Sequence, residues 1–132
     1  MSETDTMEAG TVTSAATWFE IPAREFERTV GFYETLLATR LRVERFGGPR
    51  MAVFPYERPG IGGAVIEAGV LTPGGYGTLV YLNCDGKLDE VIGRVEKAGG
   101  RLAGPKVDLP EGMGSFIHVI DPEGNRIGLH GV

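Results

Sequence analysis

The hydrophobic positions of this chain repeat one pattern twice. An apolar segment at residues 15–21 has the composition of a β-strand, and a helical stripe of apolar side chains follows it at intervals of three and four residues. The stripe consists of Phe26, Val30, Tyr33 and Leu37. Three short strands are expected next, at residues 40–46, 50–55 and about 62–67, separated by turns rich in glycine and proline. These patterns predict a βαβββ unit.

The same order of elements begins again after a linker at residues 71–77. A strand is expected at residues 78–84, and a second apolar helical stripe follows the first one by 62 residues. This second stripe consists of Leu88, Ile92 and Val95. The helix should end at Gly99, because glycine suits the left-handed conformation of a helix cap. A repeat of about half the chain predicts two tandem modules.

One module alone would expose the apolar face of its sheet, so the two modules should pair. We therefore predict an α+β fold in which two tandem βαβββ modules form a curved eight-stranded mixed sheet with a concave cleft. The expected organisation is a disordered arm at residues 1–13 and a single domain at residues 14–132. Within that domain, residues 14–70 form the first module, residues 71–77 the linker and residues 78–132 the second module.

Composition and charge narrow the possible partners. The chain has 132 residues, of which 42% are hydrophobic, and its net charge is −5 without a basic cluster, so we expect no nucleic-acid partner. No segment approaches the roughly 20 apolar residues of a membrane span, and the acidic start lacks the features of a secretory signal. Cys84 is the one cysteine, which favours a reducing compartment and a structural thiol. We expect a cytoplasmic protein that does not bind membranes.

The last hairpin, at residues 115–130, is the most specific segment. Two strands with alternating apolar side chains flank the turn Asp121-Pro122-Glu123-Gly124-Asn125. Two further motifs accompany it, Phe19-Glu20-Ile21-Pro22 ahead of Phe32-Tyr33-Glu34, and the strand Gly77-Thr78-Leu79-Val80-Tyr81-Leu82-Asn83. In this order the motifs resemble the vicinal oxygen chelate superfamily, which includes glyoxalases, extradiol dioxygenases, and bleomycin and fosfomycin resistance proteins. The resemblance extends over residues 15–130 and implies the same βαβββ duplication.

The resemblance also implies positions for metal ligands, usually His, Glu or Gln, on the first, fourth, fifth and eighth strands. The first falls at Trp18, the third at Leu79, or at Thr78 if the register shifts by one, and the fourth at Gly128. The second is ambiguous between Gly63 and Glu67. Because one carboxylate cannot hold a divalent cation by itself, we expect the metal site of the superfamily to be absent and no cofactor to be bound.

A replacement metal site is the alternative. Glu20, His118 and His130 would all face the cleft, and together they resemble a set of two histidines and one carboxylate. We disfavour this site because a histidine on a strand is usually a hydrogen-bonded wall residue, and His130 lies two residues from the end of the sequence, where fraying is common.

The alternation of side chains along strands selects the residues expected to face the cleft. Expected ligand-binding residues are Trp18, Leu79, Tyr81, Asn83, Phe116 and His130. The candidate catalytic residues are Glu20, whose carboxylate could act as a general base in partly apolar surroundings, and His118, whose imidazole can both donate and accept hydrogen bonds. Glu20 could instead be a structural residue that is hydrogen-bonded to Asn83 or Tyr81, and His118 could simply line the wall.

Three functions remain open from the sequence. The first is a metal-free protein that binds a small, partly apolar organic molecule in the cleft. The alternative is a glyoxalase-like lyase or isomerase, or a dioxygenase, that uses Glu20 and His118. A module that only contacts other proteins is the third, and it would fill the cleft with its own side chains. We expect a homodimer, because a small sheet with open edges gains from pairing and because the resemblance implies a cleft completed by a second chain.

Overall fold

The first module forms a four-stranded sheet covered by one long helix. The computed structural model describes residues 14–45 and 47–132, so the expected arm at residues 1–13 lies outside the described residues. The elements are β1 (Trp18–Ala23), α2 (Phe26–Leu37), β2 (Arg42–Arg45), β3 (Arg50–Val53) and β4 (Gly62–Glu67). Their order in the sheet is β1-β4-β3-β2, with β1 parallel to β4 and the other pairs antiparallel.

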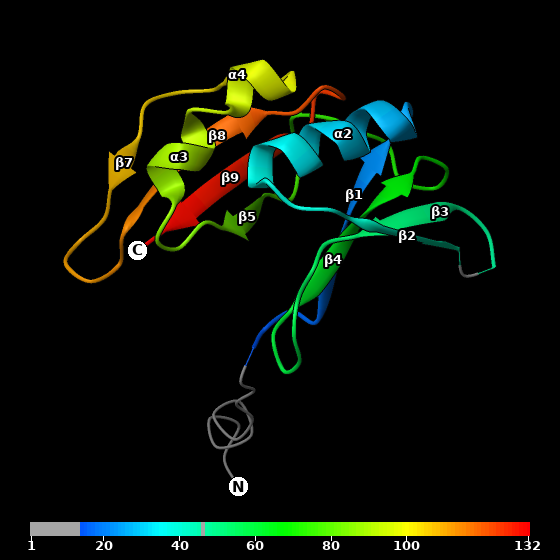
Figure 1. Ribbon diagram of the computed structural model, residues 1–132, viewed down its shortest axis with the longest axis horizontal. Helices are drawn as coiled ribbons and strands as arrows, with labels where there is room; N and C mark the ends of the chain where they lie inside the picture. Colours follow the sequence, from blue (N-terminus) through cyan, green and yellow to red (C-terminus); the bar gives the residue numbers. More distant parts are fainter. Residues whose placement is uncertain (1–13, 46) are drawn as a thin grey trace, which may run out of the picture.

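The second module repeats this plan, but its helix and its second strand are each divided into two short elements (Figure 1). Its elements are β5 (Val80–Asn83), α3 (Leu88–Ile92), α4 (Val95–Ala98), β6 (Arg101–Leu102), β7 (Val107–Asp108), β8 (Ser115–Ile120) and β9 (Arg126–Gly131). The order is β5-β9-β8-β6, with β7 also paired to β8, and β5 is parallel to β9. The predicted α+β fold with two βαβββ modules is confirmed.

Three details differ from the prediction. The strands form two hydrogen-bonded sheets rather than one continuous sheet; Pro22 in the edge strand β1 has no N–H to extend a ladder. The second strand of the second module is split into β6 and β7 around Gly104, with a φ of +134°, and Pro105. The predicted helix at residues 88–98 is interrupted at Gly93, since glycine is a weak helix former.

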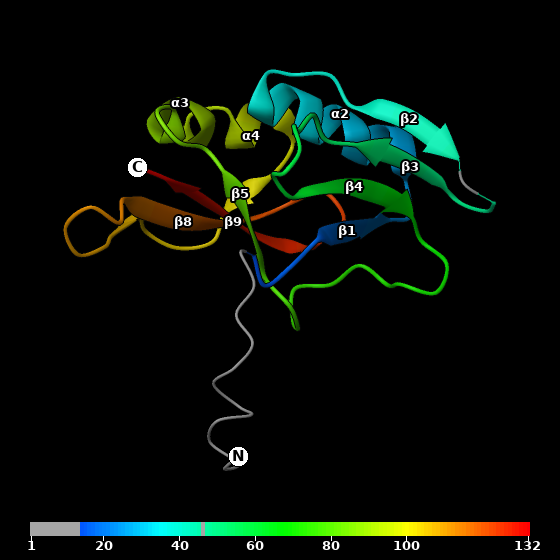
Figure 2. The same ribbon diagram turned by 90° about the horizontal axis from the view of Figure 1, so that it is seen from below.

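All helices cover one side of the two sheets, and the linker between the modules crosses the other side (Figure 2). We call this other side the exposed face. Ile21, Leu82 and Cys84 point toward the helices and are buried, as the alternation predicted. The α4 helix ends with Gly99 in the left-handed region, at a φ of +112°, which confirms the predicted cap. Among the described residues, no helix combines the length and hydrophobicity needed to cross a bilayer.

Candidate ligand-binding site

The exposed face of the second module carries two rows of side chains across β5, β9 and β8. Strand pairing aligns Tyr81 with Gly128, and Gly128 with His118. The next row aligns Asn83, His130 and Phe116 in the same way. Paired residues of neighbouring strands project from the same side of a sheet. The structure therefore brings these predicted residues of the second module together on one surface.

Tyr81 fills the space beside Gly128. A Cβ atom built on Gly128 would overlap the aromatic ring of Tyr81. Gly128 is buried as a result, whereas the tyrosine keeps 47% of its surface exposed. The position that the resemblance assigns to a metal-binding carboxylate is thus covered by a phenol ring. A side chain at residue 128 would have to displace that ring.

A chain of hydrogen bonds connects Tyr81, His118 and Arg126. The Tyr81 hydroxyl lies 2.9 Å from His118 Nε2, and Arg126 Nη1 lies 3.2 Å from His118 Nδ1. Because a guanidinium can only donate, Nδ1 must accept and the ring proton must reside on Nε2. His118 then donates to the phenol oxygen of Tyr81. The hydroxyl hydrogen of Tyr81 is left free to donate to another group.

An apolar platform adjoins this chain. The Phe116 ring packs edge-on against Tyr81, with 5.6 Å between ring centroids, and lies 5.5 Å from the His118 ring. Leu79 immediately precedes β5, at a half-buried position two residues before Tyr81. Flat apolar surface beside a few aligned polar atoms is typical of small-molecule sites.

His130 and Asn83 hold local structure on the same surface. His130 Nε2 lies 2.8 Å from the backbone oxygen of Met113, in the loop before β8. Asn83 Oδ1 accepts a hydrogen bond of 2.9 Å from the backbone N–H of Asp85. Each of these two side chains is thus hydrogen-bonded to a nearby stretch of backbone.

Glu20 and Trp18 belong to the exposed face of the first module. The indole N–H of Trp18 donates to Glu20 Oε2 at 3.3 Å, and both side chains are exposed. The prediction that Tyr81 or Asn83 could be the hydrogen-bond partner of Glu20 is wrong, because β1 and β5 belong to separate sheets. Within residues 14–45 and 47–132, no hydrogen bond or ion pair joins Glu20 to His118.

The four strand positions that the resemblance assigns to metal ligands do not supply a set of ligands. Gly63 and Glu67 both pair with β1 residues that face the helices, so neither candidate for the fourth strand reaches the exposed face. Glu67 instead accepts hydrogen bonds from the backbone and side chain of Arg50, at 2.6 and 2.8 Å, and these bonds lower its pKa. A divalent cation does not fit here, because Trp18 and Leu79 offer no ligand atom and Tyr81 covers Gly128. In the described part of the chain, no three His, Cys, Asp or Glu side chains are arranged to hold a metal ion.

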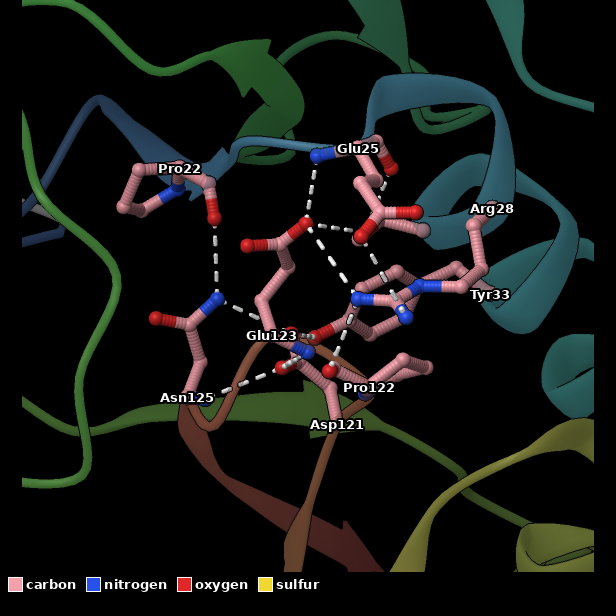
Figure 3. A network of polar contacts seen from close by, with 9 residues as sticks. Pro22, Glu25, Arg28, Tyr33, Asp121, Pro122, Glu123 and Asn125 are labelled. Atoms are coloured by element: carbon pink, nitrogen blue, oxygen red, sulfur yellow. Dashed lines mark hydrogen bonds and ion pairs between the residues drawn. The ribbon is translucent and has the colours of Figure 1, made fainter.

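The Asp121–Asn125 turn joins the two modules (Figure 3). Asp121 is 3% exposed and accepts hydrogen bonds from the Tyr33 hydroxyl at 2.7 Å and from the side-chain amide of Asn125 at 3.0 Å. Asn125 also donates to the Pro22 carbonyl at 2.9 Å. Burial, followed by the Asp121 carboxylate, holds the pKa of Tyr33 well above its usual value of 10.

Glu123 extends the same contact to the start of α2 (Figure 3). Its side chain is 3% exposed and accepts hydrogen bonds from the backbone N–H of Glu25 at 2.6 Å and the hydroxyl of Thr29 at 3.3 Å. Burial acts to raise the pKa of Glu123, but hydrogen bonds from the backbone and from Thr29, together with the charge of Arg28, lower it overall. We call the contact of residues 121–125 with β1 and α2 the turn seam. The motif itself was the sequence signal for this role, but its partners were 88 to 103 residues away.

A small pocket marks a second contact between the modules. Phe54, Ile61 and Phe19 line it from the first module. Leu82, Asn83 and Lys87 line it from the second. Its volume is about 200 Å³. We call this contact the pocket seam.

Comparisons with known proteins support the fold. No protein-family model matches the chain, and no curated protein is significantly similar to it in sequence. Solved structures do match. A glyoxalase/bleomycin resistance protein from Albidiferax ferrireducens T118 has a TM-score of 0.65 at 16% identity, over 90% of this chain and 99% of that one. A glyoxylase/bleomycin resistance protein/dioxygenase domain from Frankia sp. EAN1pec gives 0.65 at 17% identity, over 90% and 98% of the chains.

The fosfomycin resistance protein FosX from Listeria monocytogenes has a TM-score of 0.63 at 16% identity, over 91% of each chain. The chain therefore has the fold of these glyoxalase/bleomycin resistance and fosfomycin resistance proteins, which is the fold that the resemblance implied.

Proposed function

We propose that this protein binds a small, partly apolar organic molecule on the exposed face of its second module, without a metal ion. The observation that supports this most directly is the chain of hydrogen bonds from Arg126 through His118 to Tyr81 beside the Phe116 ring. It leaves the Tyr81 hydroxyl as a free donor above an apolar platform. Such a donor can hold a ligand oxygen while the rings cover the apolar part.

The enzymatic alternative is a lyase, isomerase or dioxygenase that uses Glu20 and His118. It has less support, because Glu20 is exposed and its described hydrogen bond is the one with the Trp18 indole. A general base must reach the proton that it removes, and Glu20 and His118 lie on separate sheets. Proteins with this fold include one described as a glyoxalase-related enzyme, from Fulvimarina pelagi, so the fold itself permits catalysis.

We also propose that the protein is a cytoplasmic homodimer. Three apolar side chains of the first module are well exposed, Trp18 at 37%, Tyr56 at 41% and Ile61 at 40%, and burying such surface stabilises association. Sedimentation at micromolar concentration should give particles of twice the chain mass of 14.1 kDa. Particles of one chain mass only would contradict the dimer.

A thermal-shift screen against metabolites and antibiotics in EDTA tests the binding function, because a ligand of the folded state raises its stability by mass action. For each hit, Tyr81→Phe should weaken binding by about tenfold, since one hydrogen bond to the ligand is lost. Tyr56→Phe is the matched control, a tyrosine of the first module that is 41% exposed against 47% for Tyr81, and should bind normally.

Two results would contradict the proposal. One is a set of hits whose affinities do not change in Tyr81→Phe. The other is stoichiometric Zn, Ni, Mn or Fe in protein purified without chelator, with binding that depends on that metal. Turnover of a hit that is lost in Glu20→Gln would favour the enzymatic alternative.

A further inference from the structure

Two arginines flank one residue on the exposed face of the second module. Arg101 of β6 pairs with Ile120 of β8, and Ile120 pairs on its other side with Arg126 of β9. All three side chains therefore project from the same face. Neighbouring strands are about 4.8 Å apart, so the backbones of the two arginines are separated by roughly 10 Å. Arginine side chains are long enough to meet over that distance.

No carboxylate neutralises this pair within the described part of the chain. The ion pairs there involve Arg28, Arg42, Arg50 and Lys106. The surface depression around the two arginines has a volume of about 390 Å³, and Gly75, Tyr76, Ala103 and Gly124 complete its lining without an acidic residue. The chain as a whole has 18 acidic and 13 basic residues, yet this depression is lined by two arginines and by no carboxylate. Like charges held close together cost stability, and a bound anion would remove that cost.

The arginines continue the line of the candidate ligand site. Phe116, His118 and Ile120 alternate along β8, and each step on one face of a strand is about 7 Å. The apolar platform is at one end of this line and the arginine pair is at the other. Arg126 belongs to both parts, because it also donates to His118. The Tyr76 ring, which is fully exposed, lines the same depression.

We infer that the ligand of this face carries an anionic group, a carboxylate or a phosphonate, that Arg101 and Arg126 bind beyond its apolar part. The inference rests on the proposed function and names the chemical class of its ligand. The guanidinium fork donates two parallel hydrogen bonds to such oxyanions. Tyr76 supplies a further aromatic surface beside the anion.

The test compares three probes that share one ring system, 2-naphthoate, naphthalene-2-phosphonate and the neutral 2-naphthamide. Binding is followed by NMR titration of the ¹⁵N-labelled full chain, with shifts read at residues 79–83 and 115–128. At least one anion should bind tenfold or more tightly than the amide, and this preference should weaken as salt is added. Whichever anion binds more tightly identifies the group that the arginines prefer.

Arg101→Gln should remove most of the preference for the anion and leave the affinity for 2-naphthamide unchanged. Arg40→Gln, which removes the same charge from an exposed position of the first module, should keep the preference. Equal affinities of the anions and the amide at this face would overturn the inference and leave the proposed function intact. An anion preference that survives in Arg101→Gln would also overturn it. Absence of shifts at this face with all three probes would count against both.

Discussion

The two seams between the modules lie at corresponding turns of the chain but differ in what fills them. Strands β4 and β9 are each six residues long and begin 64 residues apart, so residues 57–61 correspond to residues 121–125. The turns share a backbone hydrogen bond, from Gly60 to Glu57 at 2.7 Å and from Gly124 to Asp121 at 3.0 Å. At the turn seam a buried polar network fills the contact, whereas the pocket seam keeps a cavity of about 200 Å³.

The two turns differ in their side chains and also in their backbones, since Arg58-Pro59 is a cis peptide bond and Gly124 has a φ of +91°. Asp121 and Asn125 of one turn correspond to Glu57 and Ile61 of the other. Asn125 is 6% exposed and reaches Pro22 of β1, whereas Ile61 is 40% exposed and lines the pocket. A duplicated fold needs only one rigid contact to fix the arrangement of its halves. The pocket seam can then retain a cavity. The comparison therefore indicates that the structural role of residues 121–125 is to hold the two modules together.

The largest expected effect comes from Asp121→Ala. This change removes the acceptor of the Tyr33 hydroxyl and of three donors within the turn, and three of these four hydrogen bonds are buried. We expect a loss of about 3 to 5 kcal/mol in the free energy of unfolding, because several donors lose their acceptor, a buried carboxylate, at once. Glu57→Ala, at the matching position of the pocket seam, should change it by less than about 0.5 kcal/mol. Urea denaturation of both variants measures the contrast, and equal losses would refute it.

The second comparison is between Asn125→Ala and Ile61→Ala. Asn125 donates to Pro22 and Asp121 and accepts from the backbone of Gly74, at 2.9 to 3.0 Å. Its truncation leaves buried groups unpaired, so we expect a loss of about 2 to 3 kcal/mol. Ile61→Ala should cost about 1 kcal/mol or less, because Ile61 is partly exposed and borders an existing cavity. If Ile61→Ala were the more costly change in urea denaturation, the pocket seam would be the rigid contact.

The third prediction concerns how the stability of the protein changes at low pH. The pKa of Glu123 is lowered in the folded protein, so its ionised form stabilises the fold above the ordinary value of 4.5, and this contribution disappears as the pH falls through the lowered pKa. Glu123→Gln should lose about 1 to 2 kcal/mol at pH 7 and should show a flatter dependence of stability on pH below 4.5. Glu111→Gln, at an exposed loop position, should follow the wild type. Parallel pH curves for Glu123→Gln and the wild type would contradict this role.

Part of the fold could be predicted from the sequence alone. The hydrophobic alternation correctly predicted the βαβββ duplication and the faces of β5, β8 and β9, because burial on one side of a sheet fixes the register of a strand. The approximate range that was expected for β4, about 62–67, also agrees with the strand observed at Gly62–Glu67. The alternation could not predict that the Tyr81 ring lies over Gly128. A glycine has no side chain whose position the pattern could indicate, and the ring that covers it belongs to another strand.

The first module shows where that reasoning failed. Sequence alternation cannot decide which strands lie next to each other, so Glu20 was expected beside Tyr81 or Asn83 although β1 and β5 are in separate sheets. The turn seam was missed for a related reason. Asp121 and Tyr33 are 88 residues apart, and a turn motif does not indicate which distant residues its side chains contact. Contacts of that kind appear only once the modules are docked.

The smallest effect on stability is expected for substitutions on the exposed face, in contrast to those in the turn seam. His118→Leu removes the partner of Tyr81 and Arg126, but neither of these residues is buried, so water can replace the lost bonds. Glu20→Leu removes a long hydrogen bond between two exposed side chains. Each melting temperature should stay within about 2 °C of the wild type or rise, since polar groups kept for a ligand do not stabilise the fold. Scanning calorimetry measures this, and a fall of more than about 5 °C in both variants would identify them as structural residues like Asp121.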